Sequence, residues 1–356
     1  MRTRSRITRV NRHFPFPHPF GWFQVAWGDE LAVGDAKAAF YFDRHLVIWR
    51  DDSGEAHVQD AFCPHLGAHL GHGGVVEGCE IRCPFHGWKF NGEGANTDIP
   101  YAERTNQKGR LVTYPVVERN GAILAWYHPQ EADPMWDVPQ FPEFQGDADF
   151  APITQRSFTI DAAWQELAEN GVDSAHFRYV HNTAEVPELE KYETEGYRAT
   201  MRSLQKFPTP RGVVEGRIDV DTYGPGLTVT HFSGIVDTYL MGCNTPISAE
   251  KCELRFSFTV KSLGDEKVTN GVGQAFVNEV SRQVQEDKPV WEHKAYMVRP
   301  ALASTDGPFM KYRKWASQFY VGDVDHGEQL VFPPPLWEDR MDDAPAKATA
   351  SARLGD

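Results

Sequence analysis

The chain has few cysteines, fewer basic than acidic residues, and no long apolar run. Its 356 residues include only five cysteines, too few for a disulfide framework, which indicates a reducing compartment. Lys and Arg total 36 against 50 Asp and Glu, and the resulting charge of −14 opposes binding to nucleic acid. No apolar stretch could span a bilayer, and the arginine-containing start is not followed by the apolar segment of a secretory signal. These absences predict a cytoplasmic protein without a membrane span.

The length and the apolar pattern predict two domains. A chain of 356 residues with 41% hydrophobic residues can form about two cores. Residues 20–129 contain short apolar stretches, such as residues 38–49 and 56–62, that are typical of β-strands separated by turns. Within them, Asn120-Gly121 between two apolar runs predicts a hairpin. The first domain is therefore expected to be all-β.

The remaining chain mixes helical and strand patterns. Residues 161–170 and 275–296 have helical periodicity, and the aromatic residues between Phe309 and Tyr320 form a further helical stripe. Residues 254–261 alternate between apolar and polar side chains, which predicts a half-buried antiparallel strand. Residues 341–356 have little to bury, and we expect a loose tail there.

Four residues form a metal-ligand pattern in the first domain. Cys63-Pro64-His65 is followed, after seventeen residues, by Cys83-Pro84-Phe85-His86. Two thiolates and two imidazoles are the ligands of a Rieske 2Fe-2S cluster. A structural zinc site is the alternative, because zinc also accepts two cysteines and two histidines. Zinc fingers, however, place both cysteines in one half-site and both histidines in the other, so the spacing favours the cluster.

A second candidate site contains His176 and His181, five residues apart. Two histidines near an acidic residue are typical of the 2-His-1-carboxylate site of non-haem iron(II), which leaves positions open for dioxygen and substrate. On an ideal helix these residues would lie about 140° apart, so we expect the helix to end or distort near Gly171. The sequence alone leaves the carboxylate open among four acidic residues of the 275–296 helix, namely Glu279, Glu286, Asp287 and Glu292.

With both motifs present, the chain resembles the oxygenase component of Rieske non-haem iron oxygenases over nearly its whole length. Residues 63–70, 83–90 and 99–103 are most similar to two steroid-acting branches, the bacterial 3-ketosteroid 9α-hydroxylase oxygenases and the Neverland-type cholesterol 7-desaturases. Residues 286–291 and 306–320 resemble the C-terminal region of the 9α-hydroxylases. That likeness implies that Asp287 is the third iron ligand.

The resemblance implies a fold and two cofactors. The fold is α+β, with an all-β Rieske domain at residues 20–129 and a helix-grip (START-like) catalytic domain with an antiparallel sheet and a long helix. The catalytic domain comprises residues 130–340 together with residues 1–19. The 2Fe-2S cluster is then held by Cys63, His65, Cys83 and His86, and the mononuclear Fe(II) by His176, His181 and Asp287.

It also implies partners and a reaction. An NADH-dependent reductase of the flavin or ferredoxin type supplies electrons, and O2 is used to hydroxylate a steroid or a similar hydrophobic polycyclic molecule. Asp173 would link His176 to a cluster histidine, His65 or His86, of a neighbouring subunit in a head-to-tail homotrimer. Without that role, Asp173 is a helix-end carboxylate. Asn170 is expected near the iron or, alternatively, as a helix-stop residue.

Other functions share part of this pattern. An aromatic-ring dioxygenase, an O-demethylase and a sterol desaturase use the same metal motifs. A Rieske ferredoxin would carry electrons without catalysis, but the length of the chain and the His176/His181 pair oppose that interpretation.

Overall fold

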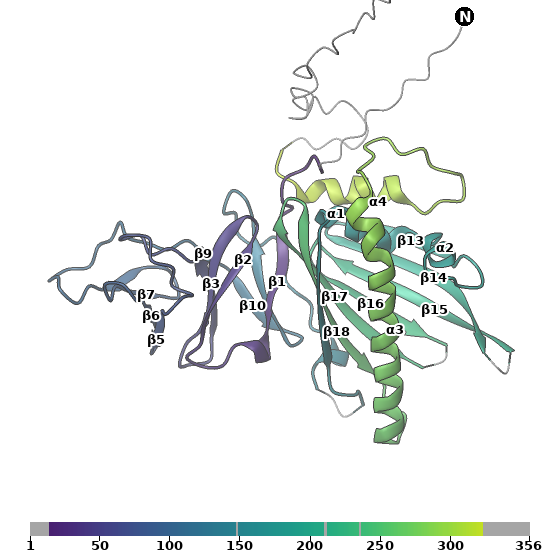
Figure 1. The fold of residues 1–356 in the computed structure, drawn as a ribbon, viewed down its shortest axis with the longest axis horizontal. Coiled ribbons are helices and arrows are strands. Elements are labelled where there is room, and N and C mark those ends of the chain that lie inside the picture. Colours follow the sequence, from purple (N-terminus) through teal and green to yellow (C-terminus); the bar gives the residue numbers. More distant parts are fainter. Residues whose placement is uncertain (1–13, 147–148, 210–211, 235, 323–356) are drawn as a thin grey trace, which may run out of the picture.

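The computed structural model describes residues 14–146, 149–209, 212–234 and 236–322 and shows two β-rich parts side by side (Figure 1). The predicted tail at residues 341–356 lies outside the described residues, as do residues 1–13 and the last part of the predicted second domain. The first described residues pack on the C-terminal part, where the Phe14 and Phe16 rings contact Tyr296, and Phe16 also contacts Tyr320.

The N-terminal part consists of three antiparallel sheets. Their strand orders are β1-β11-β10, β2-β3-β4-β9 and β5-β6-β7-β8. The strands are β1 Gly21–Trp27, β2 Ala36–Tyr41, β3 Arg44–Arg50, β4 Ala56–Asp60, β5 Val75–Glu77, β6 Glu80–Arg82, β7 Lys89–Asn91, β8 Asn96–Asp98, β9 Thr113–Tyr114, β10 Val116–Arg119 and β11 Ala122–Tyr127, with a short 3-10 turn, η1, at Gly28–Glu30. The all-β prediction for this part is confirmed.

Two hairpins illustrate what the local sequence can and cannot predict. Strands β10 and β11 are joined at Asn120-Gly121, where φ is 58° and 75°, as the predicted turn requires. Residues 38–49, where no turn was predicted from the sequence, are divided between β2 and β3 by a turn at Phe42 and Asp43, each with φ of 57°. That turn lacks the usual Asn-Gly signal. Its two amides donate to carbonyls of a strand in the C-terminal part, so tertiary contacts hold a conformation that the local sequence does not favour.

The C-terminal part is built on one seven-stranded antiparallel sheet. Its strand order is β12-β18-β17-β16-β15-β14-β13. The strands are β12 Thr154–Ile160, β13 Glu188–Glu195, β14 Arg198–Thr209, β15 Gly212–Tyr223, β16 Thr228–Ser233, β17 Thr238–Ser248 and β18 Lys251–Val260. The helices are α1 Trp164–Ala168, α2 His176–Tyr179, α3 Glu266–His293 and α4 Phe309–Ala316, with 3-10 turns η2 Pro142–Phe144, η3 Glu169–Val172 and η4 Ser317–Phe319. Sheets and helices together give the predicted α+β class.

The long helix α3 lies across one face of this sheet (Figure 1). It begins nine residues before the predicted start, because the Asp265 side chain caps it by accepting a hydrogen bond from the Val268 amide, 2.9 Å away. Val277, Val280, Val284 and Trp291 recur at helical spacing and are buried against the sheet and its neighbours. Burial of this stripe fixes the position of α3.

Strand β18 is buried on both faces, which corrects the expectation of a half-buried strand. Leu254 and Phe258 face α3, as the alternation predicts. On the opposite face Arg255, Ser257 and Thr259 are only 4%, 1% and 1% exposed. At Arg255 and Ser257 the cause is the N-terminal part, which packs on the face that a polar sequence would ordinarily turn to water. Thr259 instead donates to the carbonyl of Ala151.

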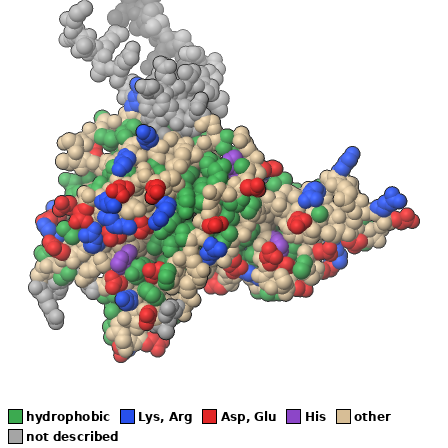
Figure 2. Space-filling view, turned by 180° about the vertical axis from the view of Figure 1, so that it is seen from behind, with side chains coloured by type: hydrophobic (Ala, Val, Ile, Leu, Met, Phe, Trp, Pro, Cys, Tyr) green, Lys and Arg blue, Asp and Glu red, His purple; other side chains and the backbone are tan. Residues whose placement is uncertain are grey.

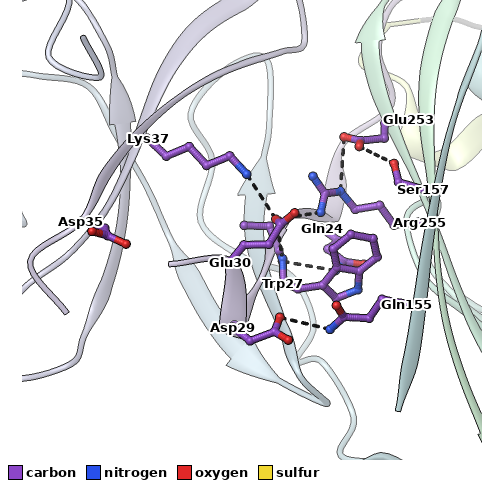
Figure 3. Close-up of polar contacts among 12 residues, drawn as sticks. Gln24, Trp27, Asp29, Glu30, Asp35, Lys37, Gln155, Ser157, Glu253 and Arg255 are labelled. Carbon is purple, nitrogen blue, oxygen red and sulfur yellow. Dashed lines mark hydrogen bonds and ion pairs between the residues drawn. The ribbon is translucent and has the colours of Figure 1, made fainter. Parts of the chain in front are cut away.

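A buried arginine lies at the centre of this interface (Figure 3). The Arg255 guanidinium pairs with Glu30 at 3.0 Å and with Glu253 at 3.2 Å. It also lies over the ring of Trp27, 4.5 Å from the ring centroid, and donates to the Tyr41 hydroxyl at 3.3 Å. Glu30, Trp27 and Tyr41 come from the N-terminal part, so one cation joins the two parts of the chain.

On the outer face of the sheet, strands β13–β15 lie beyond the N-terminal part and carry charged side chains that pair with one another. There Arg202 pairs with Asp221 at 2.9 Å, and Arg217 pairs with Asp219 at 3.4 Å and with Glu190. Figure 2, which views the molecule from behind, shows basic and acidic side chains intermixed over this region. Within the part of the chain that the structure describes, no helix has the length and apolar character needed to cross a membrane.

We expect Arg255→Ala to lower the free energy of unfolding by about 3–5 kcal/mol, because the substitution leaves the largely buried Glu253 without a cationic partner among the described residues and removes the nearer of the two cations that pair with Glu30. Lys37→Ala is the matched control, since Lys37 also pairs with Glu30, at 3.4 Å, but its side chain is 42% exposed. Its loss should cost less than about 1 kcal/mol. Denaturant unfolding of both variants measures the difference, and equal costs would contradict the importance of Arg255.

Candidate active site

The two cysteine loops have the same backbone geometry. In each loop the cysteine amide, Cys63 or Cys83, donates to the carbonyl five residues later, at 2.8 Å in both cases. The amide of Gly67 or Gly87 donates back to the cysteine carbonyl, at 2.9 and 3.1 Å. These glycines have φ of 77° and 73°, a left-handed conformation that is strained for residues with a side chain. The repeated turn presents the predicted ligands from two facing loops.

The four side chains of these loops lie together. Cys63 and Cys83 are buried next to each other, and burial raises the pKa of the Cys63 thiol to about 11. The ring centroids of His65 and His86 are 4.7 Å apart, and Trp88 stacks on His65 with the two ring planes 4° from parallel. Buried thiols of raised pKa form thiolates readily only when a metal replaces their protons. The donor set therefore fits a cluster with thiolates inside and imidazoles nearer the surface.

A broken helix places the two other histidines. The predicted helix at residues 161–170 is shorter than expected: α1 ends at Ala168 and tightens into η3, and the backbone becomes extended at Asp173. His176 then begins α2, and His181 follows shortly after its end. The helix is thus interrupted near Gly171, as predicted, and the two imidazoles come within 5.1 Å of each other, centroid to centroid.

His176, His181 and Asp287 converge in one place. Their ligand atoms all lie within 4.8 Å of one another. His181 Nε2 is 3.3 Å from Asp287 Oδ2, and both residues are buried. Asp287 reaches this position from α3 although Pro289 follows it by two residues in the same helix. Two imidazoles and one carboxylate are suitable ligands for ferrous iron.

The structure also separates the four candidate carboxylates, all of which lie on α3. Asp287 falls on the buried stripe of α3, between Val284 and Trp291, whereas the other three do not. Glu279 pairs with Arg282 at the surface, and Glu292 accepts a hydrogen bond from the Asp161 amide at 3.1 Å. Glu286 contacts His181 from the other side of its ring. The position of Asp287 within the apolar stripe of the helix is visible in the sequence and could have distinguished it from the other three.

Asn170 and Asp173 both lie beside His176. The His176 Nδ1–H donates to the main-chain carbonyl of Asp173, at 2.5 Å, which leaves Nε2 for a metal. The Asn170 amide nitrogen is 3.3 Å from this Nε2. Asp173 Oδ1 accepts from the amides of Ala175 and His176, at 3.0 and 3.3 Å, and Oδ2 is 3.9 Å from His176 Nδ1. Asp173 thus accepts hydrogen bonds from the two amides that precede and begin α2, while its carboxylate lies near the imidazole.

The two imidazoles differ electrostatically. Burial holds the pKa of His176 below its ordinary value despite the nearby carboxylates of Asp287 and Asp173. Burial also lowers the pKa of His181, but hydrogen bonds to Asp287 and Glu286 outweigh it, and the net pKa is raised. The neighbouring carboxylates therefore act most strongly on His181.

A cavity adjoins the three converging residues. It lies between the sheet and α1 and α3 and has a volume of about 230 Å³. Its walls are mainly apolar, with Phe232 and Phe256 from the sheet and Val280 from α3. Sequence reasoning did not identify these residues. Strand alternation could have grouped them on one face, but it could not show which face is hollow.

The cavity also contains a few buried polar groups. Among the described residues, Asn244 Oδ1 and the Tyr192 hydroxyl have no hydrogen-bond partner. Both residues line the cavity. They are groups that a bound molecule could satisfy.

Sequence profiles define the class of protein that carries this site. The profile of the Rieske [2Fe-2S] domain matches residues 21–115, and that of the 3-ketosteroid 9α-hydroxylase C-terminal domain matches residues 125–320. The chain belongs to the family of Rieske oxygenases that includes the oxygenase components of 3-ketosteroid 9α-hydroxylases.

Individual relatives support this membership. The oxygenase component of 3-ketosteroid-9-alpha-monooxygenase of Rhodococcus rhodochrous is 30% identical, over 85% of this chain and 83% of that protein. Cholesterol 7-desaturase of Bombyx mori is 28% identical, over 88% of this chain and 72% of that protein. The structure of dicamba monooxygenase bound to dicamba shares the fold, with a TM-score of 0.69 and 21% identity, over 84% of this chain and 96% of that one.

The chain is thus an enzyme, a Rieske-type non-haem iron oxygenase, whose cofactors are a 2Fe-2S cluster and mononuclear iron. As an oxygenase component it works with a reductase and uses O2. The expected resemblance and the two expected cofactors are confirmed. The individual ligands remain predictions that the donor geometry supports.

We expect the fully metallated protein to contain about three irons per chain, two in the cluster and one at the mononuclear site. His181→Ala should retain about two, because it removes one ligand of the mononuclear iron and leaves the cysteine loops unchanged. Cys83→Ser should lose the cluster. Iron analysis combined with the visible absorption of the cluster measures both, and a full iron content in His181→Ala would contradict the assignment.

Proposed function

We propose that this protein is the terminal oxygenase of a multicomponent monooxygenase that hydroxylates a 3-ketosteroid or a similar hydrophobic polycyclic molecule. The observation that carries the proposal is the mainly apolar cavity that adjoins His176, His181 and Asp287. The 30% identity to a 3-ketosteroid-9-alpha-monooxygenase component supports the steroid class. The adjoining cavity also opposes a simple electron carrier, which has no need of one.

The residues of the site would have separate roles. His176, His181 and Asp287 hold the iron, and Cys63, His65, Cys83 and His86 hold the cluster. When bound, these groups supply oxygen activation and one-electron transfer, respectively. The apolar walls bind the flat rings of the substrate and exclude water. Buried polar groups such as Asn244 would orient a polar substituent, because leaving them unpaired is costly.

A smaller aromatic substrate is the second candidate. The cavity volume of about 230 Å³ is below the usual range of roughly 300–1,000 Å³ for small-molecule sites. This size favours the alternative of an aromatic-ring dioxygenase or O-demethylase. Desaturation is the third outcome, supported by the 28% identity to a cholesterol 7-desaturase.

We further propose that electrons pass between subunits of a head-to-tail homotrimer. In the sequence, strands β5 and β6 lie between the two cysteine loops, and β7 and β8 follow the second loop. Figure 1 shows the sheet of these four strands at the end of the molecule remote from α3. The two proposed metal sites of one chain therefore lie far apart. Leu66 and Phe85, adjacent to the cluster ligands, are 66% and 61% exposed, which suits contact with another protein surface.

In this trimer Asp173 would link His176 to His65 or His86 of a neighbouring subunit, as the resemblance implies. The reductase would be an NADH-dependent protein of the flavin or ferredoxin type. The five free cysteines support a cytoplasmic location, since a reducing compartment keeps thiols reduced.

A panel of 3-ketosteroids, sterols and simple aromatics, turned over with a surrogate reductase and scored by product mass, tests the substrate class. We expect a 3-ketosteroid to gain one oxygen atom. Loss of two hydrogens from a sterol would support desaturation instead, and loss of a methyl group from an aromatic ether would support demethylation. Rejection of every steroid would refute the substrate proposal without affecting the iron assignments.

We expect Asp173→Ala to keep both metals and to reduce turnover at least about tenfold, because it removes the carboxylate proposed to bridge His176 and a cluster histidine while the main-chain carbonyl that accepts from His176 Nδ1 remains. Asp173→Asn separates this effect from the loss of local hydrogen bonds, since its amide oxygen can still accept from the Ala175 amide. Rapid oxidation of the reduced cluster by O2 and substrate, followed by absorbance, reports electron transfer directly. Wild-type rates in both variants would end the relay proposal.

A further inference from the structure

His181 is held between two carboxylates. Its Nε2 lies 3.3 Å from Asp287 Oδ2, and its Nδ1 lies 3.0 Å from Glu286 Oε2. The side chain of His181 is only 2% exposed, whereas that of Glu286 is 32% exposed. Glu286 therefore reaches inward from the surface of α3 to meet a buried imidazole.

The geometry gives the two carboxylates different roles. Nδ1 and Nε2 point to different sides of the imidazole ring, so an ion bound by Nε2 beside Asp287 lies away from Glu286. Glu286 is also absent from the group of donor atoms that converge within 4.8 Å. With Nε2 reserved for the metal, Nδ1 carries the proton and donates a hydrogen bond to Glu286. Glu286 thus contacts a metal ligand and not the metal.

Glu286 is itself held in place along α3. Its Oε1 accepts from Arg282, one helical turn earlier, and Arg282 pairs with Glu279 at 2.6 Å. Each of these surface ion pairs contributes little stability. Their consequence is orientation: one oxygen of Glu286 faces Arg282 and the other faces His181.

We infer that Glu286 is a positioning residue of the mononuclear iron site, which it supports through His181. The inference rests on the proposed assignment of His176, His181 and Asp287 as iron ligands. A carboxylate that accepts from the second nitrogen of a metal-bound histidine fixes the tautomer and the ring orientation and increases the basicity of the ligand.

The test measures metal affinity in the full-length protein with its cluster intact. The mononuclear iron is removed with a chelator, and ferrous ion or Co(II) is titrated back under anaerobic conditions. We expect Glu286→Ala to weaken binding about 10- to 100-fold and Glu286→Gln to weaken it less, since its amide oxygen still accepts a hydrogen bond. Glu279→Gln is the matched control: it removes charge from the same ion-pair chain without touching His181, and its affinity should stay within about twofold of the wild type.

A second readout separates positioning from a general loss of structure. The d–d absorption of bound Co(II) reports ligand geometry, and it should shift in the Glu286 variants but not in Glu279→Gln. The absorption of the Rieske cluster in the same samples shows whether the variants remain folded.

Three outcomes would overturn the inference. Wild-type affinity and an unchanged Co(II) spectrum in Glu286→Ala, together with loss of binding in His181→Ala, would leave the iron site intact and reduce Glu286 to a surface ion pair. An equal loss of affinity in Glu279→Gln would assign the effect to the net charge of α3. Wild-type binding in His181→Ala would refute the proposed iron site itself, and the inference with it.

Discussion

The docking of α3 across the seven-stranded sheet is the contact on which the catalytic half of the molecule depends. Val277, Val280, Val284 and Trp291 bury one stripe of the helix, and each such side chain contributes about 1.5–3 kcal/mol. The same stripe contains Asp287. Packing therefore performs two tasks at once, because the burial that closes the cavity also brings the carboxylate to His181.

The sheet can support this arrangement because both of its faces are used. The face toward α3 is hollowed into the cavity, and the opposite face of β18 is covered by the N-terminal part. Arg255 makes that second contact specific, since a buried cation needs the partners Glu30 and Glu253 in defined positions. The interface therefore fixes the direction in which the cysteine loops extend from the catalytic part.

The sequence predicted those features whose cause is local. The spacing of Cys63, His65, Cys83 and His86 follows from two similar tight loops, and the Asn120-Gly121 hairpin follows from two residues that tolerate positive φ. The break after α1 was also predictable, because two histidines five residues apart cannot share one face of a regular helix. In each of these cases the chemistry of a few neighbouring residues determines the geometry.

Features that depend on a distant partner were mispredicted. The alternation in β18 correctly indicated a strand, but polar residues have the same pattern whether they face water or a second domain. The turn at Phe42-Asp43 was missed because its amides are satisfied by carbonyls of Pro246 and Ile247, about two hundred residues later in the chain. Such contacts leave no local signature.

The acidic residues of α3 lie between these two cases. The four candidate carboxylates on this helix have the same chemistry, and their position relative to the apolar stripe decides what each can contact. Asp287 lies on the stripe and is buried, Glu286 lies at its edge and reaches His181 Nδ1, and Glu279 stays at the surface with Arg282. Helical phase is readable from sequence, so the stripe could have distinguished Asp287 from the rest. The contact of Glu286 could not have been predicted, because it also requires the position of His181, which is set by the separate break between α1 and α2.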